Sequence, residues 1–309
     1  MKVIYGIGRV KGKLPASMLA LGVFDGLHCG HQYLIGQMIR RAKALKVKSV
    51  VVTFFPHPAN VLNPKANLPL LIPLKQRVKL IEALGADICC VVNFTKKFSR
   101  LTPRHFIEKY IVGKVNPKEI FVGRNFRFGR NRGGSINFLK TQGRRYGFSV
   151  SAVAPLKVGN DVISSSRIRK LILEGRIDKA GRLLGRPASL FGIVHKGDGR
   201  GKTLGYPTAN IHPFNQIIPA RGVYVVQAVL HNKIFLGMAN VGTRPSFRKT
   251  NTINIEVHIF DFNRSIYGKE IEIRFLKKMR DERRFPSKEK LVKQLTRDEK
   301  AARAYSRSH

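Results

Sequence analysis

Two histidines in the segment LGVFDGLHCGH (residues 21–31) carry the strongest chemical signal in the sequence. His28 and His31 lie among glycines, which permit tight turns and close approach of the backbone to a ligand. Apolar residues before the segment indicate a strand, and apolar residues at helical spacing after it indicate a helix. Free backbone amides at the start of a helix attract anions, and two imidazoles there can donate to one phosphate. We therefore expect a nucleotide phosphate site at this strand–turn–helix unit.

A second candidate anion site is the segment ISSSRIR (residues 163–169). It places three hydroxyl groups and two arginines at the start of a predicted helix. An ordinary serine N-cap explains one of the serines but does not explain the arginines. Between the two segments lies VGRNFRFGRNRGG (residues 122–134), whose spacing fits both a loop that wraps a phosphate and a mobile basic turn.

The first half of the chain alternates between strands and helices, which predicts a parallel, doubly wound sheet. Ligands of such sheets bind at the carboxyl ends of the strands, where His28, His57 and Asn125 fall. Thr102 is predicted to cap the helix at residues 104–112, with Pro103 at the first helical position. The predicted strands are 2–10, 18–24, 48–55, 87–94 and 119–123, and the helices follow His31 as far as about residue 46, then span 74–84 and 104–112.

From about residue 186 the pattern changes to strands with period-two alternation and short polar turns. It predicts an antiparallel β domain, a small barrel closed by a helix that begins with residues 287–295. The domain boundary is expected near residues 184–188, and residues 301–309 are expected to fray. The predicted strands of this half are 191–194, 222–230, 233–240, 253–260 and 270–275.

Length and composition favour two domains of a cytoplasmic protein. The 309 residues exceed what one core usually supports, and 43% hydrophobic content suffices for packed cores. No apolar run approaches a membrane span, and the N-terminus has no signal-peptide pattern. Three cysteines, two of them adjacent, fit a reducing compartment and argue against a disulfide framework. A zinc site at Cys29 with its neighbouring histidines lacks a second pair of ligands.

The net charge of +40, from 58 basic and 18 acidic residues, has two interpretations. Nucleic-acid binding is the functional one, because neutralising phosphates dominates that affinity. The other interpretation is a proteome with a general basic bias, in which lysine and arginine occupy solvent-exposed faces. The basic residues are spread along the whole chain and no zinc-finger or RNP-type signature accompanies them, which favours the second interpretation. Specific nucleic-acid binding is therefore not expected, and weak nonspecific association with RNA or DNA is an expected side effect.

Together, GVFDGLHCGH and ISSSRIR resemble the paired signatures of the nucleotidyltransferase superfamily. The chain also contains TFFPHP (53–58), GRNFRFG (123–129), GRGKTLGYPTANI (199–211), GVYVV (222–226), NVGTRPSF (240–247) and EVHIFDF (256–262). With these motifs the sequence resembles one family most closely, the bacterial bifunctional riboflavin kinases and FMN adenylyltransferases, also called FAD synthetases. The sequence departs from that family at three serines. Ser135 occupies a position where an acid is usual, and Ser166 and Ser246 occupy positions where threonine is usual.

The resemblance implies that the first half adenylylates FMN. The FMN phosphate would attack the α-phosphate of ATP, which gives FAD and pyrophosphate. His28 and His31 are the implied catalytic residues, because they would donate to phosphate oxygens as charge builds in the transition state. The implied nucleotide-binding residues are Gly22, Phe24 and Asp25 on the adenosine side, Asn125 at a phosphate or the bound nucleotide, and Ser164, Ser165 and Arg167 at the β- and γ-phosphates.

The resemblance implies that the second half phosphorylates riboflavin. Glu256 is the implied general base, which would take the proton of the ribityl 5′-hydroxyl as that oxygen attacks the γ-phosphate of ATP. From the bare sequence, an exposed strand carboxylate paired with an arginine is the simpler interpretation of Glu256. Thr208 and Asn210 are the implied ligands of Mg²⁺. The remaining implied binding residues are Gly197, Gly199 and Lys202 in a glycine-rich segment and Arg280 in a segment that resembles the family's flavin-covering loop.

The expected fold is thus an α/β chain with two domains. A Rossmann-like nucleotidyltransferase domain with a parallel sheet (1–184) precedes a six-stranded antiparallel riboflavin kinase barrel with a terminal helix (185–309). The expected partners are riboflavin, FMN and ATP with Mg²⁺, and no membrane. Two other classes remain open, a nucleic-acid-binding protein and a flavin carrier without activity. The second is disfavoured because it could freely lose residues such as His28, Thr208 and Glu256.

Overall fold

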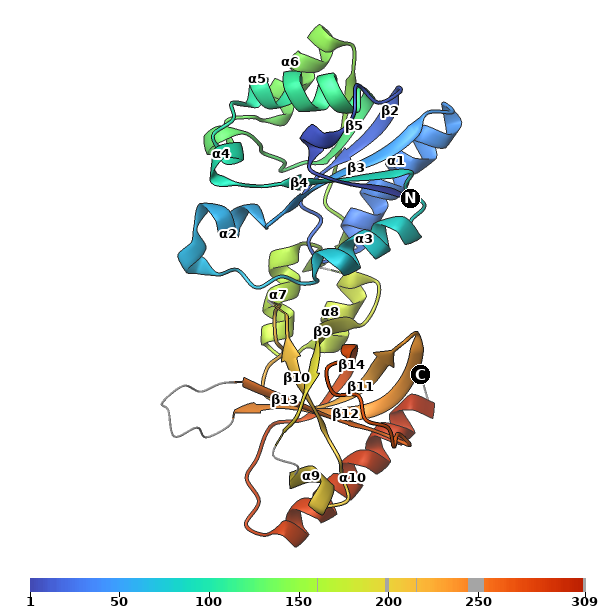
Figure 1. Ribbon diagram of the computed structural model, residues 1–309, viewed down its shortest axis with the longest axis vertical. Coiled ribbons are helices and arrows are strands. Elements are labelled where there is room, and N and C mark those ends of the chain that lie inside the picture. The colour runs from blue at the N-terminus through green and yellow to red at the C-terminus, as the bar shows by residue number, and fades with distance from the viewer. Residues whose placement is uncertain (160, 198–199, 215, 244–252, 308–309) are drawn as a thin grey trace. The chain divides into compact units, whose positions relative to one another are not determined.

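A computed structural model describes residues 1–309 with the exception of 160, 198–199, 215, 244–252 and 308–309 (Figure 1). The chain forms two compact units. The first comprises Met1–Leu70 and Leu74–Ser165, and the second comprises Leu71–Pro73 and Ser166–His309. This division falls before the predicted boundary at 184, because helix α8 (Ile177–Leu184) packs on strands of the second unit. The domain limits 1–184 and 185–309 therefore stay a prediction.

The first unit is built on a six-stranded sheet in which every strand pairing is parallel, as the alternation of elements predicts. The strand order is β1-β4-β3-β2-β5-β6, and β2 at its centre is buried along its whole length. The strands are β1 (Lys2–Tyr5), β2 (Ser17–Leu21), β3 (Lys48–Phe55), β4 (Ile88–Asn93), β5 (Pro117–Gly123) and β6 (Ser149–Val153).

Helices cover both faces of this sheet (Figure 1). Helices α1 (Cys29–Ala44) and α3 (Leu74–Ala83) lie on one face. The other face carries α6 (Ile136–Tyr146) and α5 (Pro103–Phe106), which continues as a π-helix, η3 (Ile107–Val115). The short elements are η1 (Ile7–Arg9), α2 (Pro58–Leu62), η2 (Pro64–Ala66), α4 (Lys96–Ser99), η4 (Arg130–Arg132), β7 (Lys157–Val158) and β8 (Asp161–Val162).

Most predicted elements of the first half are confirmed, including the Thr102 cap, whose hydroxyl accepts from the His105 N–H. The prediction of one strand over residues 2–10 is wrong. Gly6 has a φ of 89° and turns the chain out of the extended region, so β1 ends at Tyr5. Strand β6 was not predicted, since its alternating small and polar residues (SVSAV) give a weak apolar signal at the edge of the sheet.

The second unit contains a closed barrel of six antiparallel strands, which confirms the predicted fold. Their order around the barrel is β10-β13-β12-β11-β14-β9. Strand β10 escaped prediction because it is short and ends in a proline. The strands are β9 (Ala188–His195), β10 (Ala209–Pro213), β11 (Gly222–Leu230), β12 (Lys233–Thr243), β13 (Ile253–Ile259) and β14 (Glu270–Arg280), and the remaining helices are α7 (Ser165–Leu173), α9 (Arg200–Thr203) and α10 (Lys288–Arg307).

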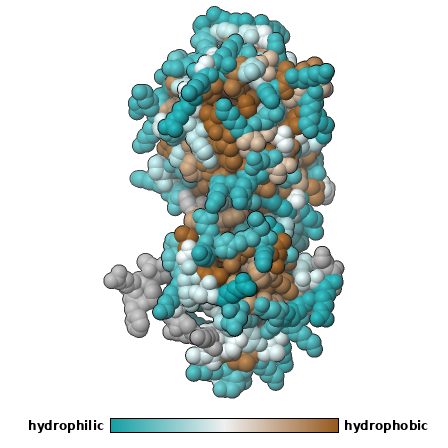
Figure 2. All heavy atoms as spheres, turned by 45° about the vertical axis from the view of Figure 1, so that its right-hand side comes forward, coloured by the Kyte–Doolittle hydropathy of each residue, from teal (hydrophilic) through white to brown (hydrophobic). Residues whose placement is uncertain are grey.

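Helix α10 is longer than its predicted core. The expected fraying is wrong for residues 301–307, which are helical, while 308–309 lie outside the described residues. Ala302 is fully buried in a cluster with Val225, Met238 and Phe260, and this burial holds the last turns of the helix. Hydrophilic residues spread over the face of the molecule in Figure 2, with hydrophobic areas between them.

Candidate active sites

The first candidate site lies at the carboxyl end of β2. The chain adds β3 and β4 on one side of β2 and β5 and β6 on the other, so the strand order reverses between β2 and β5. Open α/β sheets bind ligands at such a reversal point. The loops after β2, β3 and β5 carry His28, His57 and Asn125, as predicted, because all three strands are parallel and end at the same edge.

The turn after β2 has an unusual backbone. Phe24, Gly26 and Leu27 have φ values of 54°, 79° and 38°, which only glycine adopts without strain. Phe24 and Leu27 are also buried. Non-glycine residues in this region cost about 1–3 kcal/mol each and persist only where surrounding contacts hold them. The turn is therefore held in place by its neighbours.

His28 caps the N-terminus of α1. Its Nδ1 accepts a hydrogen bond from the His31 backbone N–H at 3.3 Å. Gly30 allows this arrangement, because a Cβ at Gly30 would lie 3.3 Å from His28 Nδ1. An accepting Nδ1 carries no proton, so the proton of a neutral His28 is on Nε2. The Nε2–H group is then the donor of the neutral His28 side chain.

His31 lies in the first turn of α1, against the ring of His28. The two ring centroids are 3.5 Å apart with planes 17° from parallel, and the ring of Phe24 meets His31 edge-on at 5.3 Å. His31 Nδ1 is buried and has no hydrogen-bond partner among the described residues. Burial, and then the His28 ring and the Arg77 guanidinium, hold the pKa of His31 well below its ordinary value. Near pH 7 the imidazole is therefore neutral.

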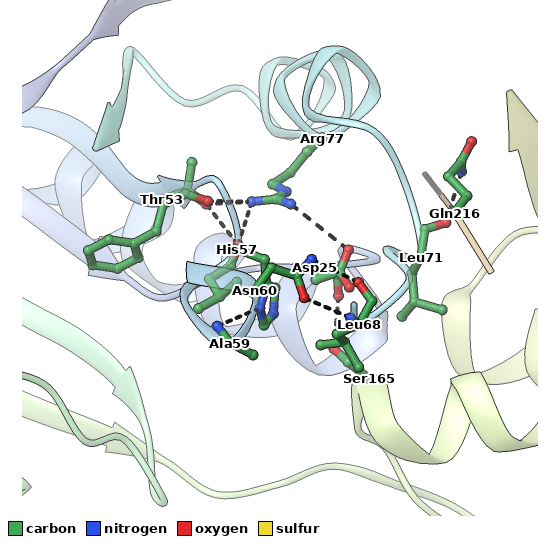
Figure 3. A network of polar contacts seen from close by, with 12 residues as sticks. Asp25, Thr53, His57, Ala59, Asn60, Leu68, Leu71, Arg77, Ser165 and Gln216 are labelled. Atoms are coloured by element: carbon green, nitrogen blue, oxygen red, sulfur yellow. Dashed lines mark hydrogen bonds and ion pairs between the residues drawn. The ribbon is translucent and has the colours of Figure 1, made fainter. Parts of the chain in front are cut away.

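Arg77 lies beside the turn on the buried face of α3 and has no exposed surface. Its Nη1 donates to the carbonyls of Val23 at 2.9 Å and Phe54 at 3.1 Å. The same nitrogen donates to Thr53 Oγ1 at 3.2 Å. Nη2 is 3.9 Å from Oδ1 of the buried Asp25, and Figure 3 shows the guanidinium between Thr53 and Asp25. The turn and the end of β3 are thus tied to one guanidinium.

The predicted residues of the second anion segment fall on both sides of the division between units. Ser164 and Ser165 belong to the first unit, and Ser165 Oγ donates to the Asp25 carbonyl at 2.9 Å. The structure thus brings Ser165 to the turn after β2. Arg167 belongs to the second unit, and its role stays a prediction.

Gly22 and Phe24 pack on one another, since a Cβ at Gly22 would lie 2.9 Å from the Phe24 ring. With the Phe24 and Asp25 side chains buried, this stretch offers a ligand mainly its backbone.

His57 caps α2, because its side chain accepts a hydrogen bond from the Ala59 N–H. This contact gives His57 a structural role.

Asn125 lies exposed in the turn after β5, at the start of the glycine- and arginine-rich loop. The loop closes on itself, because Phe128 and Gly134 exchange two backbone hydrogen bonds of 3.1 and 2.9 Å. Gly129 lies against Pro103, where a Cβ would approach within 2.7 Å. The loop is thus anchored at its middle, and its arginines leave the choice between phosphate binding and a basic surface open.

The second candidate site is a cavity of about 1010 Å³ in the second unit. Thr208, Asn210, Glu256 and Arg280 all line it. These four residues come from β10 and the segment before it, from β13 and from β14, so the barrel brings together side chains that are far apart in the sequence.

Strand register sets the polar row on the wall of this cavity. Asn210 and Asn240 are the cross-strand neighbours of Glu256 on its two sides. Asn254, two residues before Glu256 on the same face of β13, donates its side-chain N–H to Glu256 Oε1 at 2.7 Å. The carboxylate is therefore oriented by a hydrogen bond and faces the cavity between two amides.

The glycine-rich segment is described only in part. Gly197 lies against Asn210, whose side-chain amide a Cβ at Gly197 would overlap. Gly199 and the Lys202 side chain lie outside the described residues. Their predicted contacts with phosphate stay predictions.

Arg280 makes a closed ion pair with Asp298 of α10. Its Nε and Nη2 donate to the buried Asp298 carboxylate at distances of 2.7–3.2 Å. Gln294 donates to the same carboxylate at 2.7 Å. The predicted binding residue Arg280 thus also fastens α10 to the edge of the cavity.

Three residues of these sites were missed in the sequence. Arg77 had a usable signal, because it precedes the apolar Ile81 by four residues and so falls on the buried face of α3. Asn254 also had one, since residues two apart on a strand share a face with the proposed base. Asp298 had none, because its partner Arg280 is distant in the sequence.

Comparisons with known proteins match both halves of the chain. The family model of FAD synthetase matches residues 11–167, and that of riboflavin kinase matches residues 184–306. A bifunctional riboflavin kinase/FMN adenylyltransferase of Buchnera aphidicola subsp. Schizaphis graminum is 38% identical over 99% of this chain and 99% of its own length. The protein of that name from Escherichia coli K12 is 33% identical over 99% of this chain and 98% of its own.

These matches define a two-domain transferase. The chain belongs to the family of bifunctional riboflavin kinases and FMN adenylyltransferases, with the adenylyltransferase domain first and the kinase domain second. A crystal structure from Streptococcus pneumoniae, described as a macrolide-efflux protein, is also similar, with a TM-score of 0.88, 32% identity and coverage of 98% of this chain and 99% of that one. In the described part of this chain, no helix combines the length and the apolar character needed to cross a membrane.

Proposed function

We propose that FMN is adenylylated at the carboxyl end of β2. The observation that supports this assignment is the pair of stacked imidazoles at the N-terminus of α1. The FMN phosphate attacks the α-phosphate of ATP, and His28 and His31 donate to oxygens that gain charge in the transition state. Ser164, Ser165 and Arg167 bind the β- and γ-phosphates, which leave as pyrophosphate. Gly22, Phe24, Asp25 and Asn125 position the nucleotide.

The proposed kinase reaction takes place in the barrel cavity. Glu256 accepts the proton of the ribityl 5′-hydroxyl as that oxygen attacks the γ-phosphate of ATP. Its support is the position of the carboxylate, which lines the cavity and is held by Asn254. Gly197, Gly199 and Lys202 contact the phosphates of ATP, and Arg280 borders the flavin.

The donors in this cavity fit Mg²⁺. Thr208 and Asn210 offer a hydroxyl and an amide oxygen, and Mg²⁺ usually takes few protein oxygens beside water and phosphate. Among the described residues, no cluster of three or more histidine, cysteine or acidic side chains competes as a metal site. We therefore propose that Thr208 and Asn210 hold the ion, which when bound neutralises charge on the ATP phosphates.

The proposal includes a cytoplasmic location, which the low cysteine content, three in 309 residues, supports. It includes no specific nucleic-acid partner. The large positive charge is instead proposed to cause weak, salt-dependent association with RNA or DNA.

A time course tests the whole proposal. Purified protein is incubated with riboflavin, ATP and Mg²⁺, and the three flavins are separated by chromatography. FMN should appear first and FAD later, and both should require Mg²⁺. FMN without FAD would contradict the assignment of the first site. No product from a folded sample that retains nucleic acid through purification would favour a nucleic-acid-binding protein.

A further inference from the structure

Arg77 has an environment that packing alone does not explain. Its side chain is completely buried, and two of its nitrogens, Nε and Nη2, have no hydrogen-bond partner in the part of the chain that the structure describes. Burying a charged donor without a partner is unfavourable, and an apolar side chain would fill the same face of α3 at lower cost. A guanidinium at this position therefore requires another reason.

Two arginine–aspartate pairs among the described residues differ in a way that suggests the reason. Arg280 and Asp298 are joined by three hydrogen bonds of 2.7–3.2 Å, the geometry of a structural clamp. Arg77 Nη2 and Asp25 Oδ1 are 3.9 Å apart, too far for a hydrogen bond. The second pair is thus open, in the sense that its charged groups are close but not hydrogen-bonded, and it lies at the turn that precedes His28.

Nη1 is the nitrogen of Arg77 that makes hydrogen bonds, and it connects the ends of the neighbouring strands β2 and β3. Nη1 joins the Val23 carbonyl, at the start of the turn, to the Phe54 carbonyl and the Thr53 hydroxyl at the end of β3. Thr53 Oγ1 also donates to the Val23 carbonyl at 2.8 Å, which closes the network. One side chain thereby holds the strained turn against the sheet.

We propose that Arg77 is a positioning residue for adenylyl transfer: it holds the turn between β2 and α1 so that His28 and His31 meet the reacting phosphate in one orientation. The inference rests on the proposed roles of these two histidines. When nucleotide occupies the site, the open pair with Asp25 closes and tightens the turn, since catalytic hydrogen bonds often shorten only in the complex. Burial and the His28 ring lower the pKa of His31, and the positive charge of Arg77 adds to this effect.

Steady-state kinetics of the full-length protein test the inference. Arg77→Met is expected to lower kcat for FAD formation from FMN and ATP by about 100-fold, the effect of a small misplacement of catalytic groups. The KM for ATP should change less than about threefold, because the groups that bind ATP are still present. Arg77→Lys keeps the charge but not the planar fork, and its kcat should fall by about tenfold.

Two controls separate this role from general stability. The kinase activity of the same protein reports on the second unit and should stay unchanged. Gln142→Met changes another buried polar side chain of the first unit, on α6, and should leave FAD formation unchanged. Equal losses in Gln142→Met and Arg77→Met would overturn the inference, as would a wild-type kcat in Arg77→Met. If Arg77→Met does not fold, Arg77→Lys decides, and a wild-type kcat in that variant rejects the positioning role.

His28→Asn distinguishes failure of the inference from failure of the proposed site. Asparagine still caps a helix, so this variant removes the imidazole and keeps the cap. If His28→Asn loses FAD formation and Arg77→Met does not, only the inference about Arg77 is wrong. If both variants keep full activity, the site assignment itself is wrong.

Discussion

The two sites of this chain differ in the groups that they present to a nucleophile. The site at the end of β2 presents N–H donors, and its nearby carboxylate, Asp25, is buried beside Arg77. The cavity of the barrel presents the carboxylate of Glu256, held between two amides. The proposed reactions explain the difference. A phosphate nucleophile is already ionised and needs no base, whereas a hydroxyl nucleophile must lose a proton.

The sites also differ in how they are held. A strained turn carries the histidines, and hydrogen bonds from Arg77 on α3 and from Ser165 keep it in place. The register of paired strands positions Glu256 and its neighbours, without backbone strain at these residues. We therefore expect substitutions of the residues that support the turn to lower activity at the first site. Activity at the second site should respond mainly to substitutions of residues that line the cavity.

The largest expected effect is that of Glu256→Gln on the kinase. The amide cannot accept the proton of the hydroxyl, so kcat for FMN formation should fall by about 1000-fold, within the usual range for loss of a general base. Chromatographic assay of FMN formed from riboflavin and ATP measures it. FAD formation from FMN should be unchanged in the same protein. A folded variant that loses both activities would show that the two sites are not independent.

The reciprocal change replaces both His28 and His31 with alanine. FAD formation should fall on the order of 100-fold, because donors to the transition state are lost. FMN formation should continue at the wild-type rate, and a FAD assay beside an FMN assay measures both. If the double variant kept full FAD formation, the two histidines would not be the donors of the first site, and the proposed difference between the two sites would be wrong.

A smaller effect is expected from Asn254→Ala. This change removes the hydrogen bond of 2.7 Å that orients Glu256 and leaves the carboxylate itself. The kinase kcat should fall by about tenfold, the equivalent of one hydrogen bond to a charged group. Glu270→Gln, an exposed carboxylate on β14, is the matched control and should have no effect. Equal activity of wild type and Asn254→Ala would mean that strand register alone orients the base.

The smallest effect concerns the pH dependence of stability in the first unit. The pKa of His31 is held well below its ordinary value of 6.5 by burial, His28 and Arg77. In acid the unfolded chain therefore binds a proton that the folded chain does not, so the free energy of unfolding falls as the pH drops below about 6.5. Hydrogen exchange in the first unit between about pH 7 and pH 5 measures this loss.

Substitution of His31 provides the test of that prediction. His31→Gln should be less sensitive to acid over this window, whereas His105→Gln, at an exposed position, should behave as the wild type does. An unchanged slope in His31→Gln would mean that other groups set the acid sensitivity of the first unit.

The fold was largely predictable because its elements have strong local patterns. The buried strand Lys48–Phe55 and the barrel strand Gly222–Leu230 have the bounds that their apolar patterns predict. The failures come from weak or nonlocal signals. Strand β10 is short, β6 is an edge strand, and the last turns of α10 depend on burial of Ala302 against distant strands.

Candidate site residues could be selected from the sequence where they lie in one segment. His28 and His31 belong to one turn, and Thr208 and Asn210 to another, so their spacing is visible in the sequence. The contacts of Arg77 with Val23 and of Arg280 with Asp298 join residues that are 54 and 18 positions apart. Helical spacing can place Arg77 on the buried face of α3, but it does not identify the partner of either arginine. Candidate motif residues could thus be selected from the sequence, whereas the partners of the supporting residues required the three-dimensional structure.

The closed barrel has a consequence for the order of events on the ribosome. Strand β9 begins the barrel and must pair with β14, the last strand to be synthesised, before the barrel can close. The parallel sheet of the first unit is complete once β6 has emerged, well before β14 exists. A ribosome stalled before β14 would therefore carry a complete sheet and a barrel with open edges, which are prone to aggregate. During synthesis the domain for the second reaction can fold first, in the reverse order of the two reactions.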